Sequence, residues 1–136
     1  MKFLEFFLAL LLGPVVCIIL SLILNHKISF NPPLSIKLLA IQLFMVAIPE
    51  EIFFRGIILE ILREKIKTGI GKLSIANIIT AFLFALAHLF YHPPLWALAT
   101  FFPGLIFGYF KERTDSLIYP IILHFFYNFS FLTFFK

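Results

Sequence analysis

The sequence predicts an all-α protein, a polytopic transmembrane bundle of about five membrane helices. Apolar residues make up 62% of the 136 positions, whereas a typical soluble domain has about 45–50%. Only 13% of the residues are charged, and most of the basic ones lie in short gaps between long apolar runs. A soluble domain of this length needs more polar side chains to cover its surface. A lipid bilayer is therefore the expected environment, and we expect one membrane-embedded domain spanning residues 1–136.

Five apolar segments come close to the length of about 20 helical residues that crosses a hydrocarbon core. They are Phe3–Leu24, Leu38–Leu62, Leu73–Tyr91, Leu95–Phe110 and Leu117–Phe135. The first is long and carries Glu5 early, so we expect a retained membrane helix and not a signal peptide. The fourth is short and contains Pro103 and Gly104, so we expect it to be bent, tilted or not fully spanning.

The gaps between these segments contain residues that break helices. They are Asn31-Pro32-Pro33, Gly69-Ile70-Gly71, His92-Pro93-Pro94 and Thr114-Asp115-Ser116. With alternating spans, seven Lys and Arg residues fall on one side of the membrane and three on the other. The richer side holds Lys2, Arg63, Lys65, Lys67, Lys72, Lys111 and Arg113. Because cytoplasmic loops are rich in Lys and Arg, we expect a cytoplasmic amino terminus.

The basic residues also bear on partners. They lie in short membrane loops and not along one folded face, so we expect no nucleic-acid partner. The single cysteine, Cys17, excludes an intrachain disulfide. The lipid bilayer is the first expected partner. Gly104 and Gly108 form a G-x-x-x-G pattern, which we interpret as close helix packing within the bundle.

Several polar side chains lie deep within the apolar segments, where an ionisable group costs at least a few kcal/mol. They are Glu50, Glu51, Arg55, His88, His124 and Asn128. Residues four apart share a helix face, so Glu51 can pair with Arg55. Glu50 then lies about 100° around the same helix. His124 and Asn128 share a face in the same way, as do Phe84 and His88.

These residues have a structural interpretation and a functional one. A lone buried histidine is more often structural than catalytic, and an isolated Glu–Arg pair usually serves packing. An additional carboxylate, two histidines and an asparagine on three spans are harder to explain in this way. Apolar replacements would make a membrane bundle easier to fold. The pattern therefore favours a shared, inward-facing polar site.

The same residues resemble three motifs of the CPBP intramembrane proteases, the CAAX-protease and bacteriocin-processing (Abi) family. Glu50-Glu51-Ile52-Phe53-Phe54-Arg55 is similar to the family's Glu-Glu-x-x-x-Arg motif. Phe84-Ala85-Leu86-Ala87-His88 is similar to its Phe-x-x-x-His motif, and His124-Phe125-Phe126-Tyr127-Asn128 to its His-x-x-x-Asn motif. The resemblance covers Leu38 to Phe135 in the family's order. It implies a catalytic core in residues 38–136, preceded by a leading helix and loop in residues 1–37.

The resemblance implies peptide-bond hydrolysis by activated water, with a membrane-associated protein or peptide as substrate. By analogy, Glu50 is the base and His88 orients the water. His124 and Asn128 stabilise the oxyanion, a contribution of about 2.7–4 kcal/mol per donor. Glu51, Arg55 and Phe84 hold these residues in position without contacting the substrate. We also expect a multi-pass integral membrane protein of the plasma (inner) membrane of a prokaryote.

The sequence leaves the role of a metal open. Glu50, His88 and His124 are a conceivable zinc set with water as the fourth ligand. The helical His-Glu-x-x-His pattern of many zinc proteases is absent from the sequence. A metal-free glutamate mechanism is slightly favoured.

Two other classes of function compete with a protease. One is a non-catalytic membrane immunity or adaptor protein that retains the fold and binds a partner. The other is a small ion or proton carrier, because intramembrane Glu and His also mark proton relays.

Overall fold

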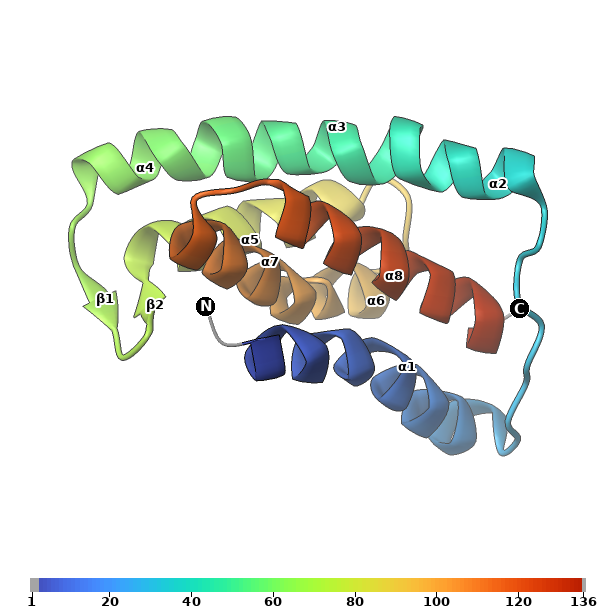
Figure 1. Cartoon of the computed structure of the whole chain (residues 1–136). Coiled ribbons are helices and arrows are strands. Elements are labelled where there is room, and N and C mark those ends of the chain that lie inside the picture. The colour runs from blue at the N-terminus through green and yellow to red at the C-terminus, as the bar shows by residue number, and fades with distance from the viewer. Residues whose placement is uncertain (1–2, 136) are drawn as a thin grey trace. The chain divides into compact units, whose positions relative to one another are not determined.

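The computed structural model describes residues 3–135, which are helical except for one short hairpin and the connecting turns. Within them, the helices are α1 (Phe3–Asn25), α2 (Ile36–Ile41), α3 (Ile48–Glu51), α4 (Leu59–Lys65), α5 (Ile75–His88), α6 (Pro94–Ala99), α7 (Phe101–Thr114) and α8 (Ile118–Phe135). Two π-helical segments, η1 (Gln42–Ala47) and η2 (Ile52–Ile58), join α2, α3 and α4 without a break, as Figure 1 shows. The predicted all-α class is confirmed.

Two helices, α1 and α8, are each long and apolar enough to cross a membrane. The apolar helix α5 is shorter, and the second predicted segment is found as the consecutive helices from Ile36 to Lys65. The polytopic arrangement with five spans stays a prediction.

The fourth predicted segment is two helices and not one. α6 ends at Ala99, and α7 begins at Phe101 and continues to Thr114, beyond the predicted end at Phe110. Pro103 explains the break, because it has no N–H to donate and its ring would clash with the carbonyl of Ala99 four residues earlier. As the third residue of α7, Pro103 sits in the first turn, where helical N–H groups have no partner in any case.

The predicted loop at Gly69–Gly71 is a β-hairpin. β1 (Gly69–Ile70) pairs antiparallel with β2 (Leu73–Ser74), and Gly71 has a φ of +61° at the turn, a conformation that glycine adopts without strain. Ser74 then caps α5, its side chain accepting from the backbone N–H of Asn77 at 2.9 Å. The hairpin thus fixes where α5 begins.

The chain forms two compact units, and the first comprises residues 3–48 and 122–135 of the described chain. In this unit α1 packs closely on α8. The Tyr127 hydroxyl donates to the carbonyl of Ala9, and the Ser21 hydroxyl lies 3.2 Å from the carbonyl of Phe134. A Cβ at Gly13 would lie 2.5 Å from the Tyr127 ring, so only glycine permits this approach.

The second unit, residues 49–121, is built around the packing of α5 against α7. Gly104 and Gly108 both face α5: a Cβ at Gly104 would lie 3.3 Å from that of Ala81, and one at Gly108 only 1.8 Å from Asn77 Oδ1. The amide of Asn77 also donates to the carbonyl of Leu105 at 2.9 Å. The G-x-x-x-G pattern is therefore a packing surface within the chain, as predicted.

Candidate active site

Glu50 and His88 come together from two elements of the second unit. Glu50 lies on α3, and His88 is the last residue of α5. His88 Nε2 lies 3.9 Å from Glu50 Oε2, with the side chains 16% and 32% exposed. Both side chains are therefore partly exposed, although the Glu50 Oε2 atom that makes the contact is buried.

The ring of His88 contacts the preceding turn of its own helix. Its Nδ1 lies 2.7 Å from the carbonyl oxygen of Phe84, and the two rings are 4.4 Å apart between centroids. Because a carbonyl oxygen only accepts, Nδ1 carries the hydrogen and donates it. In neutral His88 the lone pair of Nε2 is then on the side of Glu50. Phe84 thus contacts His88 through both its backbone carbonyl and its ring.

The separation between Nε2 and Oε2 has a chemical meaning. At 3.9 Å it exceeds a direct hydrogen bond, which spans about 2.7–3.2 Å. Two acceptors at this separation can share one water molecule that donates a hydrogen to each, through two bonds of about 2.8 Å. The pair is thus suited to hold a water molecule between a carboxylate and an imidazole.

Glu51 and Arg55 form the predicted ion pair, and it is fully buried. Arg55 Nη1 lies 3.1 Å from Glu51 Oε1, and both side chains have 0% exposure. Arg55 Nη2 donates to the carbonyl oxygen of Gly104 at 2.8 Å. The guanidinium carbon also lies 4.4 Å from the Phe84 ring centroid and 5.2 Å from that of Phe107, within cation–π range.

This ion pair connects the elements that carry Glu50 and His88. Arg55 reaches α7 through Gly104 and α5 through Phe84, while Glu51 follows Glu50 directly on α3. A rigid support of this kind fixes where two reacting side chains meet. The sequence singled out Gly104 for helix packing but not as the acceptor for Arg55, because that role belongs to its backbone carbonyl.

His124 and Asn128 belong to α8 in the first unit. His124 is buried, and the Asn128 amide donates to Gln42 Oε1 on η1 at 3.1 Å. The sequence analysis missed Gln42, although an amide within an apolar run is a detectable signal. The structure brings Glu50 to His88 and Asn128 to Gln42. The convergence of the two pairs on one pocket stays a prediction.

The backbone near Glu50 and Glu51 is unusual. The π-helical segments η1 and η2 flank the short α-helical turn that carries both carboxylates. π-helical turns are rare and frequent at functional sites. Pro49 explains η1, because it cannot donate the hydrogen bond that the carbonyl of Met45 would receive in an α-helix.

The predicted zinc set comprises Glu50, His88 and His124. Among residues 3–135, no three His, Cys, Asp or Glu side chains gather closely enough to hold a metal ion. A zinc ion held by Glu50, His88 and His124 stays a prediction.

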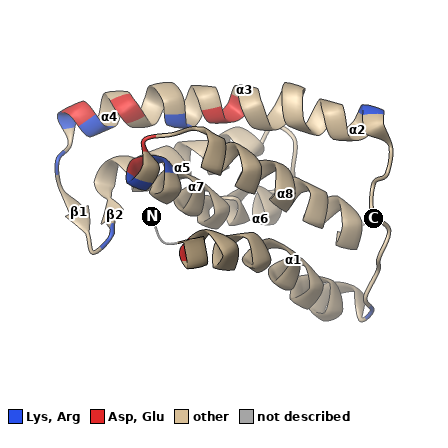
Figure 2. Ribbon diagram, in the orientation of Figure 1, with Lys and Arg blue, Asp and Glu red and all other residues tan. Residues whose placement is uncertain are grey.

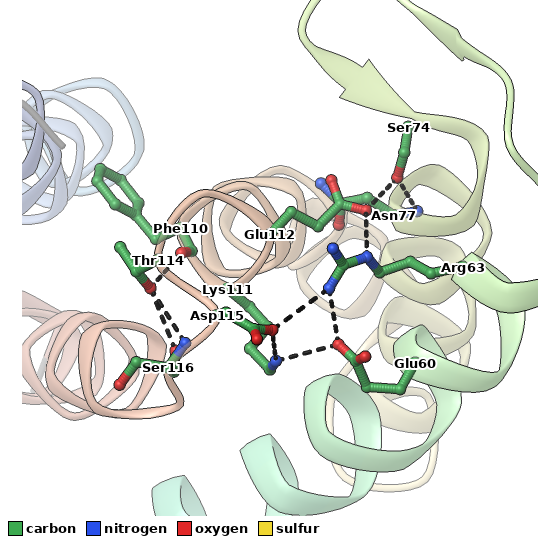
Figure 3. A network of polar contacts seen from close by, with 10 residues as sticks. All are labelled: Glu60, Arg63, Ser74, Asn77, Phe110, Lys111, Glu112, Thr114, Asp115 and Ser116. Carbon is green, nitrogen blue, oxygen red and sulfur yellow. Dashed lines mark hydrogen bonds and ion pairs between the residues drawn. The ribbon is translucent and has the colours of Figure 1, made fainter.

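A second polar cluster lies at the other end of the second unit, where α4, α7 and the hairpin meet (Figure 3). Lys111 Nζ lies 3.0 Å from Glu60 Oε1 and 3.1 Å from Asp115 Oδ1. Arg63 Nη1 lies 2.8 Å from Glu60 Oε1, and Ser74 donates to Glu112. These contacts join α4, α7 and the hairpin at this end of the unit.

Comparison with known proteins supplies the family. No characterised protein and no solved structure matches the chain significantly. One family model, type II CAAX prenyl endopeptidase Rce1-like, matches residues 32–130, a range that includes Glu50, His88, His124 and Asn128. The family is membrane-embedded and implies protease activity. The match covers most of the sequence, so the chain belongs to the Rce1-like family of type II CAAX prenyl endopeptidases.

Proposed function

We propose that this protein is an intramembrane endopeptidase in which Glu50 and His88 activate a water molecule to hydrolyse a peptide bond. The observation that carries the proposal is the 3.9 Å contact between Glu50 Oε2 and His88 Nε2. The orientation of the imidazole by Phe84 and membership of the protease family support it.

The chemistry follows from the two acceptors. The water oxygen attacks the carbonyl carbon while Glu50 takes one of its protons and His88 Nε2 accepts the other hydrogen in a hydrogen bond. The tetrahedral intermediate then loses the amine, to which Glu50 returns the proton as the C–N bond breaks. General acid–base catalysis of this kind contributes about 10²–10⁴-fold to a rate.

His124 and Asn128 are proposed to stabilise the oxyanion. Both carry N–H donors on one face of α8, and the Gln42 contact fixes the amide of Asn128. The proposed substrate is a membrane-associated protein or peptide, and the proposed location is the plasma membrane of a prokaryote. The multi-pass arrangement and the cytoplasmic amino terminus belong to the same proposal.

The first test compares cells that express the wild-type chain with cells that express Glu50→Gln. New protein termini in the membrane fraction, identified by mass spectrometry, are expected with the wild type and absent with the variant. Glu64→Gln is the matched control, since Glu64 is an exposed carboxylate farther along the same helical run. Termini that persist undiminished in Glu50→Gln would exclude Glu50 as the base and favour a non-catalytic role.

A further inference from the structure

Two amide side chains meet in an uncharged part of the first unit. Asn128 on α8 donates through Nδ2 to Gln42 Oε1 on η1 at 3.1 Å, and both residues are half-buried. Residues 38–48 and all of α8 lack Asp, Glu, Lys and Arg, and Figure 2 shows α8 without a charged position. An amide among apolar side chains loses free energy unless it is hydrogen-bonded. The two amides therefore depend on each other for a partner.

The orientation of the Asn128 amide depends on this bond. Within residues 3–135, it is the only hydrogen bond that either amide side chain makes. The last torsion of an asparagine side chain has no sharp preference of its own, so its hydrogen bonds decide where its oxygen and nitrogen lie. Gln42 thus determines the direction in which Asn128 presents its N–H groups.

α8 itself is held in place by other contacts. The Tyr127 hydroxyl donates to the carbonyl of Ala9 on α1, and the close approach of Gly13 to the Tyr127 ring fixes the packing of these two helices. Tyr127 directly precedes Asn128 on α8. Loss of the Gln42 bond would therefore leave the helix in place and release only the Asn128 amide.

We propose that Gln42 is a positioning residue of the hydrolytic reaction, which holds one N–H of Asn128 so that the second N–H keeps a fixed direction for the oxyanion. An amide nitrogen carries two hydrogens in one plane, so fixing the first also fixes the second. A donor oriented in advance stabilises the developing charge without reorganising during the reaction. Gln42 itself does not touch the reacting atoms. This inference rests on the proposed function, in which Asn128 is an oxyanion donor.

The test compares the kinetics of full-length proteins in nanodiscs, namely the wild type, Gln42→Met, Asn128→Ala and the double variant. Methionine keeps the length of glutamine and removes the amide acceptor. With a substrate identified through its Glu50-dependent termini, kcat of Gln42→Met should fall about 10-fold or more, and less than the about 10²–10³-fold expected when one oxyanion donor is lost in Asn128→Ala. KM should stay unchanged, because the oxyanion develops only in the transition state.

The control and the double variant separate positioning from other roles. Leu43→Met is the matched control, since Leu43 follows Gln42 on η1 and is also half-buried. If Gln42 acts through Asn128, Gln42→Met has no further effect on kcat in the Asn128→Ala background. An equal fall in both backgrounds, a Gln42→Met rate equal to that of Leu43→Met, or an Asn128→Ala rate equal to that of the wild type would overturn the proposal.

The amide contact is also measured without catalysis, by NMR of protein labelled with the magnetic nitrogen isotope. The side-chain amide signals of Asn128 are those that disappear in Asn128→Ala. They should shift in Gln42→Met and not in Leu43→Met, and unchanged signals in Gln42→Met would overturn the proposal. If no cleavage depends on Glu50, the hydrolytic function fails, while these signals still decide whether Gln42 orients Asn128. The two failures are therefore distinguishable.

Discussion

At the scale of single residues, His88 depends on contacts that no sequence motif states. The spacing of Phe84 and His88 predicted a shared helix face, but not that the carbonyl of Phe84 would receive the Nδ1 hydrogen and orient Nε2. Similarly, the spacing of Glu51 and Arg55 predicted their ion pair. It could not predict the bond from Arg55 to Gly104, because that bond depends on how α7 packs.

Arg55 is expected to be essential for stability. In Arg55→Leu the buried Glu51 carboxylate loses its guanidinium, and breaking a buried pair on one side costs about 3–5 kcal/mol. The double variant Glu51→Leu/Arg55→Leu removes both charges and should be more stable than the single variant. Thermal unfolding of the purified protein in nanodiscs measures both. A single variant as stable as the wild type would show that the pair is not buried in this way.

At the scale of elements, hydrophobic length predicted where the helices lie better than where they break. α1 and α8 nearly match the predicted segments, because each is a continuous apolar run between turn residues. Pro103 predicted an irregularity in the fourth segment, but the helix breaks at Thr100, ahead of the proline. The π-helical segments were not predicted, because they change the hydrogen bonding without changing the apolar pattern.

Gly108 is predicted to be required for the packing of α5 against α7. In Gly108→Ala the new Cβ would lie 1.8 Å from Asn77 Oδ1 and 2.4 Å from its Cγ, so the helices must shift. Overpacking of this kind costs about 1–3 kcal/mol. Gly56→Ala is the matched control, because its Cβ meets Leu117 at an ordinary 3.4 Å. Equal melting temperatures for the two variants would contradict this packing.

At the scale of the whole molecule, the second unit has two separate groups of polar residues. The charged network around Lys111 lies where α4, α7 and the hairpin meet, and Glu50 and His88 meet at the far end of α5. The sequence predicted on which helices the polar residues of the proposed site lie. It could not predict the contact between Lys111 and Glu60, because these two residues come from different helices whose contact depends on the fold.

Asp115 gives the network a dependence on pH. The hydrogen bond from Lys111 and the positive charges of Lys111 and Arg63 lower the pKa of the Asp115 carboxyl, although its side chain is 81% exposed. A lowered pKa stabilises the folded state above the unfolded value of about 3.9, and the contribution is lost as pH falls through the folded value. Asp115→Asn should therefore lower the melting temperature slightly at pH 7 and leave it unchanged well below about pH 3.

The difference in melting temperature between the wild type and Asp115→Asn should also depend on the salt concentration. Exposed charge pairs are screened within about 8 Å at physiological ionic strength and within about 3 Å at 1 M. The difference between wild type and Asp115→Asn at pH 7 should thus shrink in 1 M salt. A difference that grows as the pH falls below about 4 would contradict the lowered pKa.

The most direct test of the proposed water activation by Glu50 and His88 is the cleavage rate of the purified protein. The wild type, Glu50→Gln and Glu64→Gln are reconstituted in nanodiscs with one substrate found through its new termini, and their rates are compared. We predict a rate at least about 10²-fold lower for Glu50→Gln, because general acid–base catalysis is lost. Glu64→Gln should match the wild type. A Glu50→Gln rate equal to that of the wild type would show that Glu50 and His88 do not activate the water.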